Sequence, residues 1–153
     1  MSAYAIGVGS NLGDRAAQHD RAAQLLAADG MVALRARSRL HETSAIGGPA
    51  GQPSYLNAAW VVATDLGPHQ LLHRLQAIET ALGRVRTVVD GPRPIDLDLL
   101  LREDGLIATT AVLALPHPRL HLRAFVLAPL AEVAGPWRHP RLGLTIAELR
   151  ARL

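Results

Sequence analysis

The order of two hydrophobic periodicities most restricts what this chain can fold into. Residues 4–8 are apolar, and a stretch rich in turn-forming residues, 9–14, separates them from an Ala- and Leu-rich segment over 15–28. The first pattern is typical of a buried strand and the second of a helix. Residues 32–40 then alternate between arginine and smaller side chains, which predicts a half-exposed strand. The chain therefore begins with strand, helix and strand.

A second unit of the same kind follows. Residues 55–64 are mostly apolar, with Asn57 as a polar interruption, and predict a strand that is buried on both faces. Apolar residues recur at helical spacing over 71–82, Gly83 ends that pattern, and residues 95–101 alternate as a strand does. Two successive strand-helix-strand units predict an α+β fold of the ferredoxin-like βαββαβ kind, in which helices cover one face of an antiparallel sheet.

The remaining segments add helices and loops to this plan. Residues 123–134 predict a helix and a short final helix begins at residue 146, so we expect C-terminal helical additions. Residues 42–54 and 84–94 contain too many glycines and prolines for regular structure and are expected to be loops. A length of 153 residues with 49% hydrophobic side chains suits one core. Because no linker or repeat is evident, we expect a single domain over residues 1–153.

Two absent residue types exclude several classes of chemistry. Without cysteine the chain has no disulfide, thiolate nucleophile or Cys-ligated metal, and a cytoplasmic location is expected. Without lysine it lacks the P-loop lysine and cannot form a Schiff base. The formal net charge of +3 favours anionic ligands weakly. No apolar run reaches the roughly 18–20 residues that span a bilayer, so no membrane partner is expected.

The strongest local signal for chemistry is a pair of carboxylates. Asp96 and Asp98 are two residues apart on a predicted strand, so both side chains share a face, with their Cβ atoms roughly 7 Å apart. That spacing suits Mg²⁺ ions, which take one or two protein carboxylates and fill their other positions with water and phosphate oxygens. Arg84, Arg86 and Arg93 lie just upstream and could hold a polyanion that bridges such metals. Simple polar alternation on an exposed strand explains the pair equally well.

Several stretches, taken in order, resemble one enzyme family. These stretches are Gly9-Ser10-Asn11-Leu12-Gly13-Asp14, Glu42-Thr43, Gln52-Pro53-Ser54-Tyr55-Leu56-Asn57-Ala58, Ile78-Glu79, Gly83-Arg84-Val85-Arg86, Gly91-Pro92-Arg93-Pro94-Ile95-Asp96-Leu97-Asp98-Leu99-Leu100, Pro116-His117-Pro118 and Arg123-Ala124-Phe125-Val126-Leu127. Each is modest alone, but together they span nearly the whole chain and form a specific set. In this set the chain is similar to the 6-hydroxymethyl-7,8-dihydropterin pyrophosphokinases of folate synthesis.

The resemblance implies a ferredoxin-like α+β fold and a Mg²⁺-dependent transfer of diphosphate from ATP to the hydroxymethyl group of the pterin, with release of AMP. It also implies a monomer with small-molecule substrates and no nucleic acid. Asp96 and Asp98 would hold two Mg²⁺ ions, and both would be catalytic together with Arg84 and Arg93. The residues expected to contact ATP are Gln76, Glu79, Arg84, Arg93, His117 and Arg123. The residues expected around the pterin ring are Thr43, Ala45, Ile46, Tyr55, Asn57 and Phe125.

The residue types suit that pterin assignment. A flat heterocycle needs apolar partners and an amide that donates and accepts at once, and Asn57 is the polar side chain inside its strand. Phe125 is the single phenylalanine of the chain. One departure is visible, because family members commonly carry a tryptophan just before the Gly-Pro-Arg element, where this chain has residues 87–90, Thr-Val-Val-Asp.

Two other functions use some of the same features. A nucleotidyltransferase would employ the same aspartates and arginines but would attack the α-phosphorus of ATP, so its product would be free diphosphate rather than AMP. An RNA-binding module on the same fold would need aromatic side chains on the central strands to stack bases. Those strands supply only Tyr4, Tyr55 and Trp60.

Overall fold

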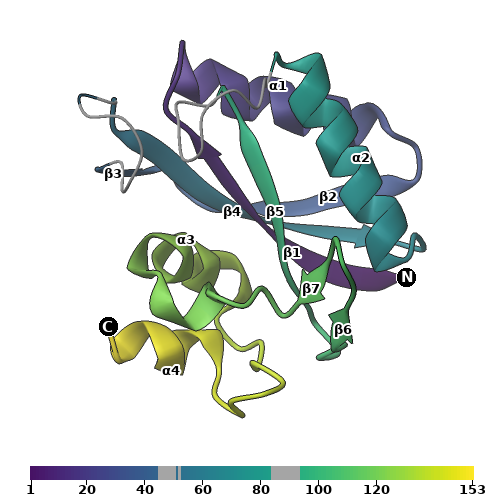
Figure 1. Cartoon of the computed structure of the whole chain (residues 1–153), viewed down its shortest axis with the longest axis vertical. Helices are drawn as coiled ribbons and strands as arrows, with labels where there is room; N and C mark the ends of the chain where they lie inside the picture. The colour runs from purple at the N-terminus through teal and green to yellow at the C-terminus, as the bar shows by residue number, and fades with distance from the viewer. Residues whose placement is uncertain (45–50, 52, 84–93) are drawn as a thin grey trace.

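The computed structural model describes residues 1–44, 51, 53–83 and 94–153 and contains one principal antiparallel sheet (Figure 1). The order of its strands is β2-β4-β1-β5, and the short β3 also pairs with β4. The strands are β1 (Ser2–Ser10), β2 (Val32–Arg37), β3 (His41–Thr43), β4 (Tyr55–Thr64) and β5 (Asp96–Arg102). Strand β4 thus lies between β1 and β2, while β1 lies between β4 and β5. Each strand-helix-strand unit has a strand of the other unit inserted into it, which confirms the predicted ferredoxin-like arrangement.

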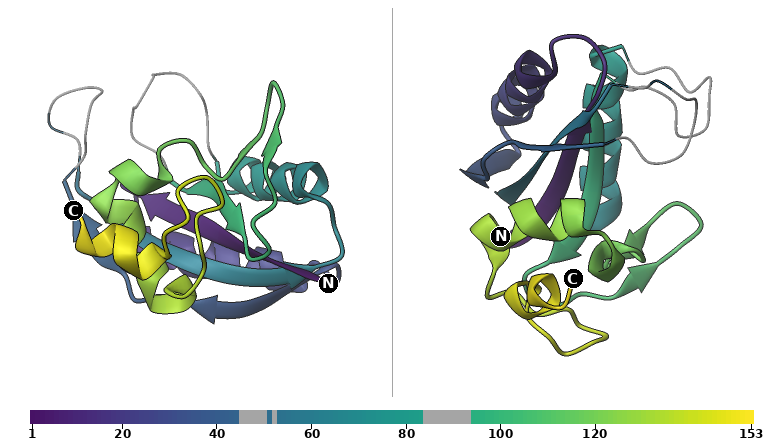
Figure 2. Two further views of the ribbon diagram at one scale, coloured as in Figure 1. Left: turned by 90° about the horizontal axis from the view of Figure 1, so that it is seen from below. Right: turned by 90° about the vertical axis from the view of Figure 1, so that its left-hand side faces the viewer.

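Helices α1 (Arg15–Ala28) and α2 (Pro68–Ala81) cover one face of this sheet (Figures 1 and 2). The Asp14 side chain caps α1 by accepting a hydrogen bond of 3.1 Å from the backbone N of Ala17. Gly83 follows α2 with a φ of 92°, a conformation that glycine adopts without strain. Leu26, Leu71 and Leu75 are fully buried between the helices and the sheet, so this face holds the larger core.

The opposite face is only partly covered by helices. Helix α3 (Ala124–Ala134) and helix α4 (Ile146–Ala151) pack against the sheet together with the short 3-10 helix η1 (Leu120–Leu122). Their buried side chains, among them Leu127 and Leu130, meet Ala59 and Leu100 of the sheet in a second core. Figure 2 shows these elements on the side of the sheet away from α1 and α2. These are the C-terminal helical additions that the sequence predicts.

Two parts of the strand pattern differ from what the sequence predicts: the segment over residues 32–43 and a short hairpin near residue 110. Residues 32–40 were expected to be one strand, but β2 ends at Arg37 and β3 begins at His41, so both pair in turn with the same edge of β4. Ser38 bridges the interruption, because its backbone N donates to Ala59 O and its Oγ accepts from Ala59 N, both at 2.8 Å. A small hairpin, β6 (Ala108–Thr109) with β7 (Ala114–Leu115), was also not predicted. Pairs this short leave too few residues to show a period.

No helix in residues 1–44, 51, 53–83 and 94–153 is long and apolar enough to cross a membrane.

The larger core gives a direct test of the fold. We expect Leu75→Ala to lower the free energy of unfolding by about 2–5 kcal/mol, because the fully buried side chain leaves a cavity between α2 and the sheet. The matched control is Leu25→Ala on α1, where the leucine is 41% exposed and the change should stay within about 0.5 kcal/mol. Urea unfolding of both variants checks this, and equal losses would contradict the packing described.

Candidate active site

A pocket of about 660 Å³ opens between the sheet and the N-terminal end of α3. Strands β1, β3, β4 and β5 form its floor and one wall, and the segment from residue 119 into α3 forms the opposite wall. The lining residues are Gly7, Val8, Gly9, Thr43, Ser44, Tyr55, Asn57, Ala58, Asp96, Asp98, Leu100, Arg119, Leu122, Arg123, Phe125 and Val126.

The floor of the pocket follows from strand register. In β1, Gly9 is paired with Asn57 of β4 on one side and with Asp96 of β5 on the other, while Gly7 is paired with Asp98. Directly paired residues of antiparallel strands project to the same face. The two glycines therefore separate an amide on one side from two carboxylates on the other.

These glycine positions leave space that a side chain would fill. A Cβ atom on Gly9 would lie 3.3 Å from Asn57 Oδ1 and 3.5 Å from Cδ1 of Tyr55. A Cβ on Gly7 would lie 3.4 Å from the side chain of Leu100. The pocket floor is consequently bare backbone, which lets a ligand approach the centre of the sheet.

On the β4 side of the floor, a polar amide is oriented by its neighbour. Asn57 is 8% exposed, and its Nδ2 donates a hydrogen bond of 2.5 Å to Oγ1 of Thr43 on β3. Tyr55 and Phe125 line the pocket beside this pair. An amide that both donates and accepts, together with aromatic walls, suits a flat heteroaromatic ring.

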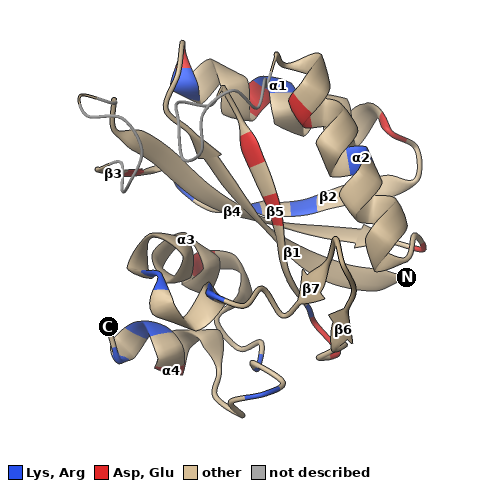
Figure 3. Cartoon of the chain, viewed as in Figure 1, with Lys and Arg blue, Asp and Glu red and all other residues tan. Residues whose placement is uncertain are grey.

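On the β5 side, acidic and basic groups face the same space. Asp96 and Asp98 are half-buried, and Figure 3 shows the acidic positions on β5. Arg119 and Arg123 line the opposite wall. Within the part of the chain that the structure describes, no three His, Cys, Asp or Glu side chains form a metal cluster. Two carboxylates nevertheless fit Mg²⁺ when the ligand supplies phosphate oxygens, because Mg²⁺ is commonly held by one or two carboxylates and the substrate.

His117 lies beside this charged region without lining the pocket itself. Its backbone N donates to Leu100 O at 2.7 Å, and its Nδ1 accepts from the backbone N of Arg119 at 3.2 Å. The accepting Nδ1 places the proton of the neutral ring on Nε2. Burial lowers the pKa of His117, the positive charges of Arg123 and Arg119 lower it further, and the charge of Asp96 opposes them. His117 is therefore close enough to the arginines and to Asp96 for their charges to affect its pKa.

Two expected nucleotide contacts are on α2, away from the pocket lining. Glu79 is 4% exposed, and its Oε2 accepts a hydrogen bond of 2.9 Å from the backbone N of Leu97. This contact ties α2 to β5 at the end of the sheet. Gln76 is exposed one turn earlier on the same helix. Neither side chain is among those that line the pocket.

The structure brings together most of the expected site residues that it describes. Thr43, Tyr55, Asn57, Asp96, Asp98, Arg123 and Phe125 all line one pocket, although they come from sequence positions up to 82 apart. Ala45, Ile46, Arg84 and Arg93, like the 87–90 stretch that replaces the family tryptophan, lie outside the described residues.

Sequence reasoning assigned no role to nine of the sixteen lining residues, among them Gly7, Gly9, Arg119 and Leu122. Gly7 lies in the predicted strand 4–8, but Gly9 was placed in the turn-forming stretch 9–14, whereas β1 extends to Ser10. The alternation of the two glycines along one face of a strand therefore went unrecognised. Arg119 is four residues before Arg123, and both line the wall. Leu122 is 64% exposed and has no distinguishing signal in the sequence.

Comparison with known proteins gives one consistent result. The family model of 7,8-dihydro-6-hydroxymethylpterin-pyrophosphokinase matches residues 5–135. A 2-amino-4-hydroxy-6-hydroxymethyldihydropteridine pyrophosphokinase of Methylorubrum extorquens is 42% identical over 156 residues, which cover 100% of this chain and 94% of that protein. A relative of the same name from Synechocystis sp. is 38% identical over 144 residues, which cover 94% of this chain and 72% of the relative.

The solved structures show the same fold within a larger protein. The crystal structure of wild-type Plasmodium falciparum HPPK-DHPS superposes with a TM-score of 0.75 at 14% sequence identity. The match covers 99% of this chain and 44% of that one, so this chain spans less than half of its length. At this identity the likeness concerns the fold alone.

The charges around His117 can be tested by titration. We expect NMR titration to give this imidazole a pKa below its ordinary value of 6.5, because burial disfavours the charged ring. Arg123→Met should raise that pKa by removing a nearby positive charge, and Asp96→Asn should lower it by removing a negative one. Arg150→Met, an exposed change on α4, serves as the control and should leave it in place. An unchanged pKa in the first two variants would contradict the arrangement.

Proposed function

Because this chain belongs to the 7,8-dihydro-6-hydroxymethylpterin-pyrophosphokinase family, we propose that its pocket holds the pterin and the polyphosphate of ATP side by side across the glycine floor. The chain is a pyrophosphokinase of folate biosynthesis, and ATP is its cosubstrate. The observation that carries the proposal is the register of β1, since Gly9 has an amide on one flank and a carboxylate on the other. The hydroxymethyl group would lie between these flanks.

The pterin half of the proposal rests on the β4 side. The Asn57 amide would pair with donor and acceptor atoms of the ring, and Thr43 holds that amide in place through the 2.5 Å hydrogen bond. Aromatic side chains would pack against the ring faces. The complete proposed set is Thr43, Ala45, Ile46, Tyr55, Asn57 and Phe125, of which Ala45 and Ile46 lie outside the described residues.

The phosphate half rests on the β5 side and on α3. Asp96 and Asp98 would hold two Mg²⁺ ions, which would neutralise the charge of the ATP phosphates. Arginine donors suit phosphate oxygens because the guanidinium group presents a planar fork of N–H groups. The proposed ATP-contacting set is Gln76, Glu79, Arg84, Arg93, His117 and Arg123, and Arg84 and Arg93 are counted with the aspartates as catalytic.

Catalysis of this reaction depends mainly on positioning the two substrates and stabilising charge, and little on covalent chemistry by the protein. The pterin hydroxyl oxygen forms a bond to the β-phosphorus of ATP, the bond from that phosphorus to the oxygen bridging to the α-phosphorus breaks, and AMP leaves. The hydroxyl proton passes to solvent. Asn57 would fix the orientation of the attacking group, while Arg123 and the Nε2–H of His117 would donate to phosphate oxygens as charge shifts toward AMP.

Three further expectations belong to the same proposal. The whole of residues 1–153 would form a single domain, that domain would act as a monomer, and it would work in the cytoplasm on small molecules. The monomer is carried over from the family resemblance.

One assay separates this function from nucleotidyl transfer. The protein is incubated with ATP, Mg²⁺ and 6-hydroxymethyl-7,8-dihydropterin, and the nucleotide product is identified by chromatography. Pyrophosphoryl transfer yields AMP and the diphosphorylated pterin. Release of free diphosphate with a pterin-linked AMP would identify attack at the α-phosphorus and overturn the proposal.

The carboxylate pair provides the first mutational prediction. We expect Asp96→Asn and Asp98→Asn each to lower kcat by several orders of magnitude, because each removes a negative ligand from the proposed metal site. Both changes are isosteric and the pocket is open, so thermal unfolding should change little. Asp20→Asn, on the exposed surface of α1, is the matched control and should keep full activity. Near-normal turnover of both variants at saturating Mg²⁺ would refute the metal assignment.

The glycines of the pocket floor provide the second mutational prediction. We expect Gly9→Ala to raise the KM for the pterin by roughly 10- to 200-fold, since the new methyl group would take up space on the pocket floor, and one methylene of misfit in a substrate pocket is worth about 1–3 kcal/mol. The control is Gly30→Ala, where an added Cβ would have no atom within 4 Å. Steady-state kinetics with each substrate varied in turn measures the effect. A pterin KM equal in the two variants would show that the floor does not bind the ring.

A further inference from the structure

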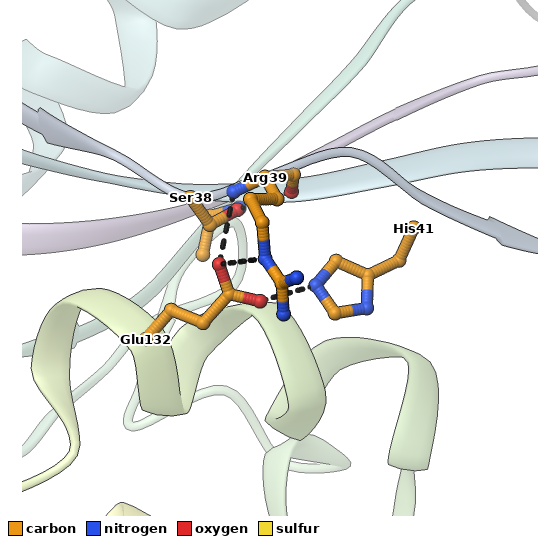
Figure 4. Close-up of polar contacts among 5 residues, drawn as sticks. Ser38, Arg39, His41 and Glu132 are labelled. Atoms are coloured by element: carbon orange, nitrogen blue, oxygen red, sulfur yellow. Dashed lines mark hydrogen bonds and ion pairs between the residues drawn. The ribbon is translucent and has the colours of Figure 1, made fainter.

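A carboxylate on α3 joins that helix to the segment that contains β3. Glu132 Oε1 accepts hydrogen bonds from the backbone N of Arg39 at 3.0 Å and from its Nε at 3.4 Å, and Oε2 accepts from Nε2 of His41 at 2.5 Å (Figure 4). The side chains of His41 and Glu132 are 22% and 21% exposed, whereas that of Arg39 is 84% exposed. The bond to the His41 side chain is therefore less exposed than the bond to the Arg39 guanidinium.

The cluster lies at a fixed distance from the pocket along two regular elements. Phe125 and Glu132 are seven residues apart on α3, so they share a helix face and are separated by about 10 Å. His41 and Thr43 are two residues apart on β3, so they share a strand face and are separated by about 7 Å. Helix α3 and strand β3 are thus joined directly by Glu132 and His41, and Phe125 and Thr43 of the same two elements line the pocket.

Strand β3 has little else to hold it against α3. It has three residues and, among the residues that the structure describes, pairs with β4 alone at the edge of the sheet. The second core, which packs α3 onto the sheet, includes no residue of β3 among those described. A short edge strand without apolar anchoring is marginally stable. Among the described residues, the Glu132 cluster supplies a polar link between β3 and α3.

We propose that Glu132 is a positioning residue for pterin binding. It holds β3 against α3, so that Thr43, which orients the Asn57 amide, keeps its spacing from Phe125 across the pocket. Glu132 does not line the pocket and has no contact with substrate in this scheme. His41 is its principal partner. The inference rests on the proposed placement of the pterin beside Asn57.

The expected result is a selective loss of pterin affinity. Glu132→Ala and His41→Leu should each raise the KM for the pterin by roughly 5- to 50-fold, because small misplacements of a binding wall are costly even when they arise outside the site. The KM for ATP should stay within about twofold, since the carboxylates on β5 are held by β1 rather than by β3. Thermal unfolding is measured for every variant.

Two further variants, one conservative and one that removes only an exposed group, separate a positioning role from a general loss of structure. His41→Gln retains an N–H donor near the position of Nε2 and should restore most of the pterin KM that His41→Leu loses. Arg39→Ala removes the exposed guanidinium but keeps the backbone N that Glu132 accepts from, so it should have little effect. If Glu132→Ala fails to fold, His41→Leu carries the same test, because it removes the donor to Oε2 and leaves Glu132 in place.

The outcomes distinguish this inference from the proposed function. If the wild type releases no AMP with the pterin, the proposed function fails and this inference fails with it. If the wild type is active and both variants keep the wild-type pterin KM, only the positioning role is overturned. Equal increases in the KM for pterin and ATP, or no rescue by His41→Gln, would also overturn it, because they indicate a general structural effect.

Discussion

The pairing of β1 with both of its neighbours is the constraint on which the rest of the site depends. Gly9 faces Asn57 on one side and Asp96 on the other only in the observed register. Because side chains alternate along a strand, a shift of one residue would turn both polar side chains toward the core under α1 and α2. The burial of Ile6 and Val8 on that opposite face makes such a shift costly. The hydrophobic core therefore fixes the alignment of the polar groups.

The helices of the second face divide the same sheet surface into two regions. At one end, Ala59 and Val61 are covered by α3 and α4, whereas at the other end the surface is open as the pocket, and Leu100 belongs to both regions. Arg123 stands at the N-terminal end of α3, on the boundary between the two regions. Its guanidinium lies 5.6 Å from the centre of the Phe125 ring, so a cation and an aromatic wall are presented together. One helix end thereby contributes to both proposed halves of the site.

The sequence correctly predicted the elements that have a long hydrophobic period. It did not predict short elements, or contacts between residues that are far apart in the chain. The strands and helices of both strand-helix-strand units, and the outward alternation of Asp96 and Asp98, are confirmed because apolar periodicity is enforced by burial. Strand β3 was missed because three residues show no period. The bond between His41 and Glu132 joins residues 91 positions apart, and nothing local marks either as a partner of the other. The assignments of individual residues to pterin and ATP stay predictions.

The contact of Glu79 with Leu97 has a consequence for how this protein behaves among its own copies. β5 ends the sheet, and an uncovered end strand offers backbone N–H and C=O groups to any passing chain. The Glu79 carboxylate occupies one such N–H, and the backbone N of His117 occupies the carbonyl of Leu100 further along the strand. The Glu79 carboxylate and the backbone of His117 thus occupy two backbone groups on the outer edge of β5. Glu79 and His117, both proposed to contact ATP, thus also occupy backbone groups of β5 through which a strand of another chain could pair, Glu79 with its side chain and His117 with its backbone.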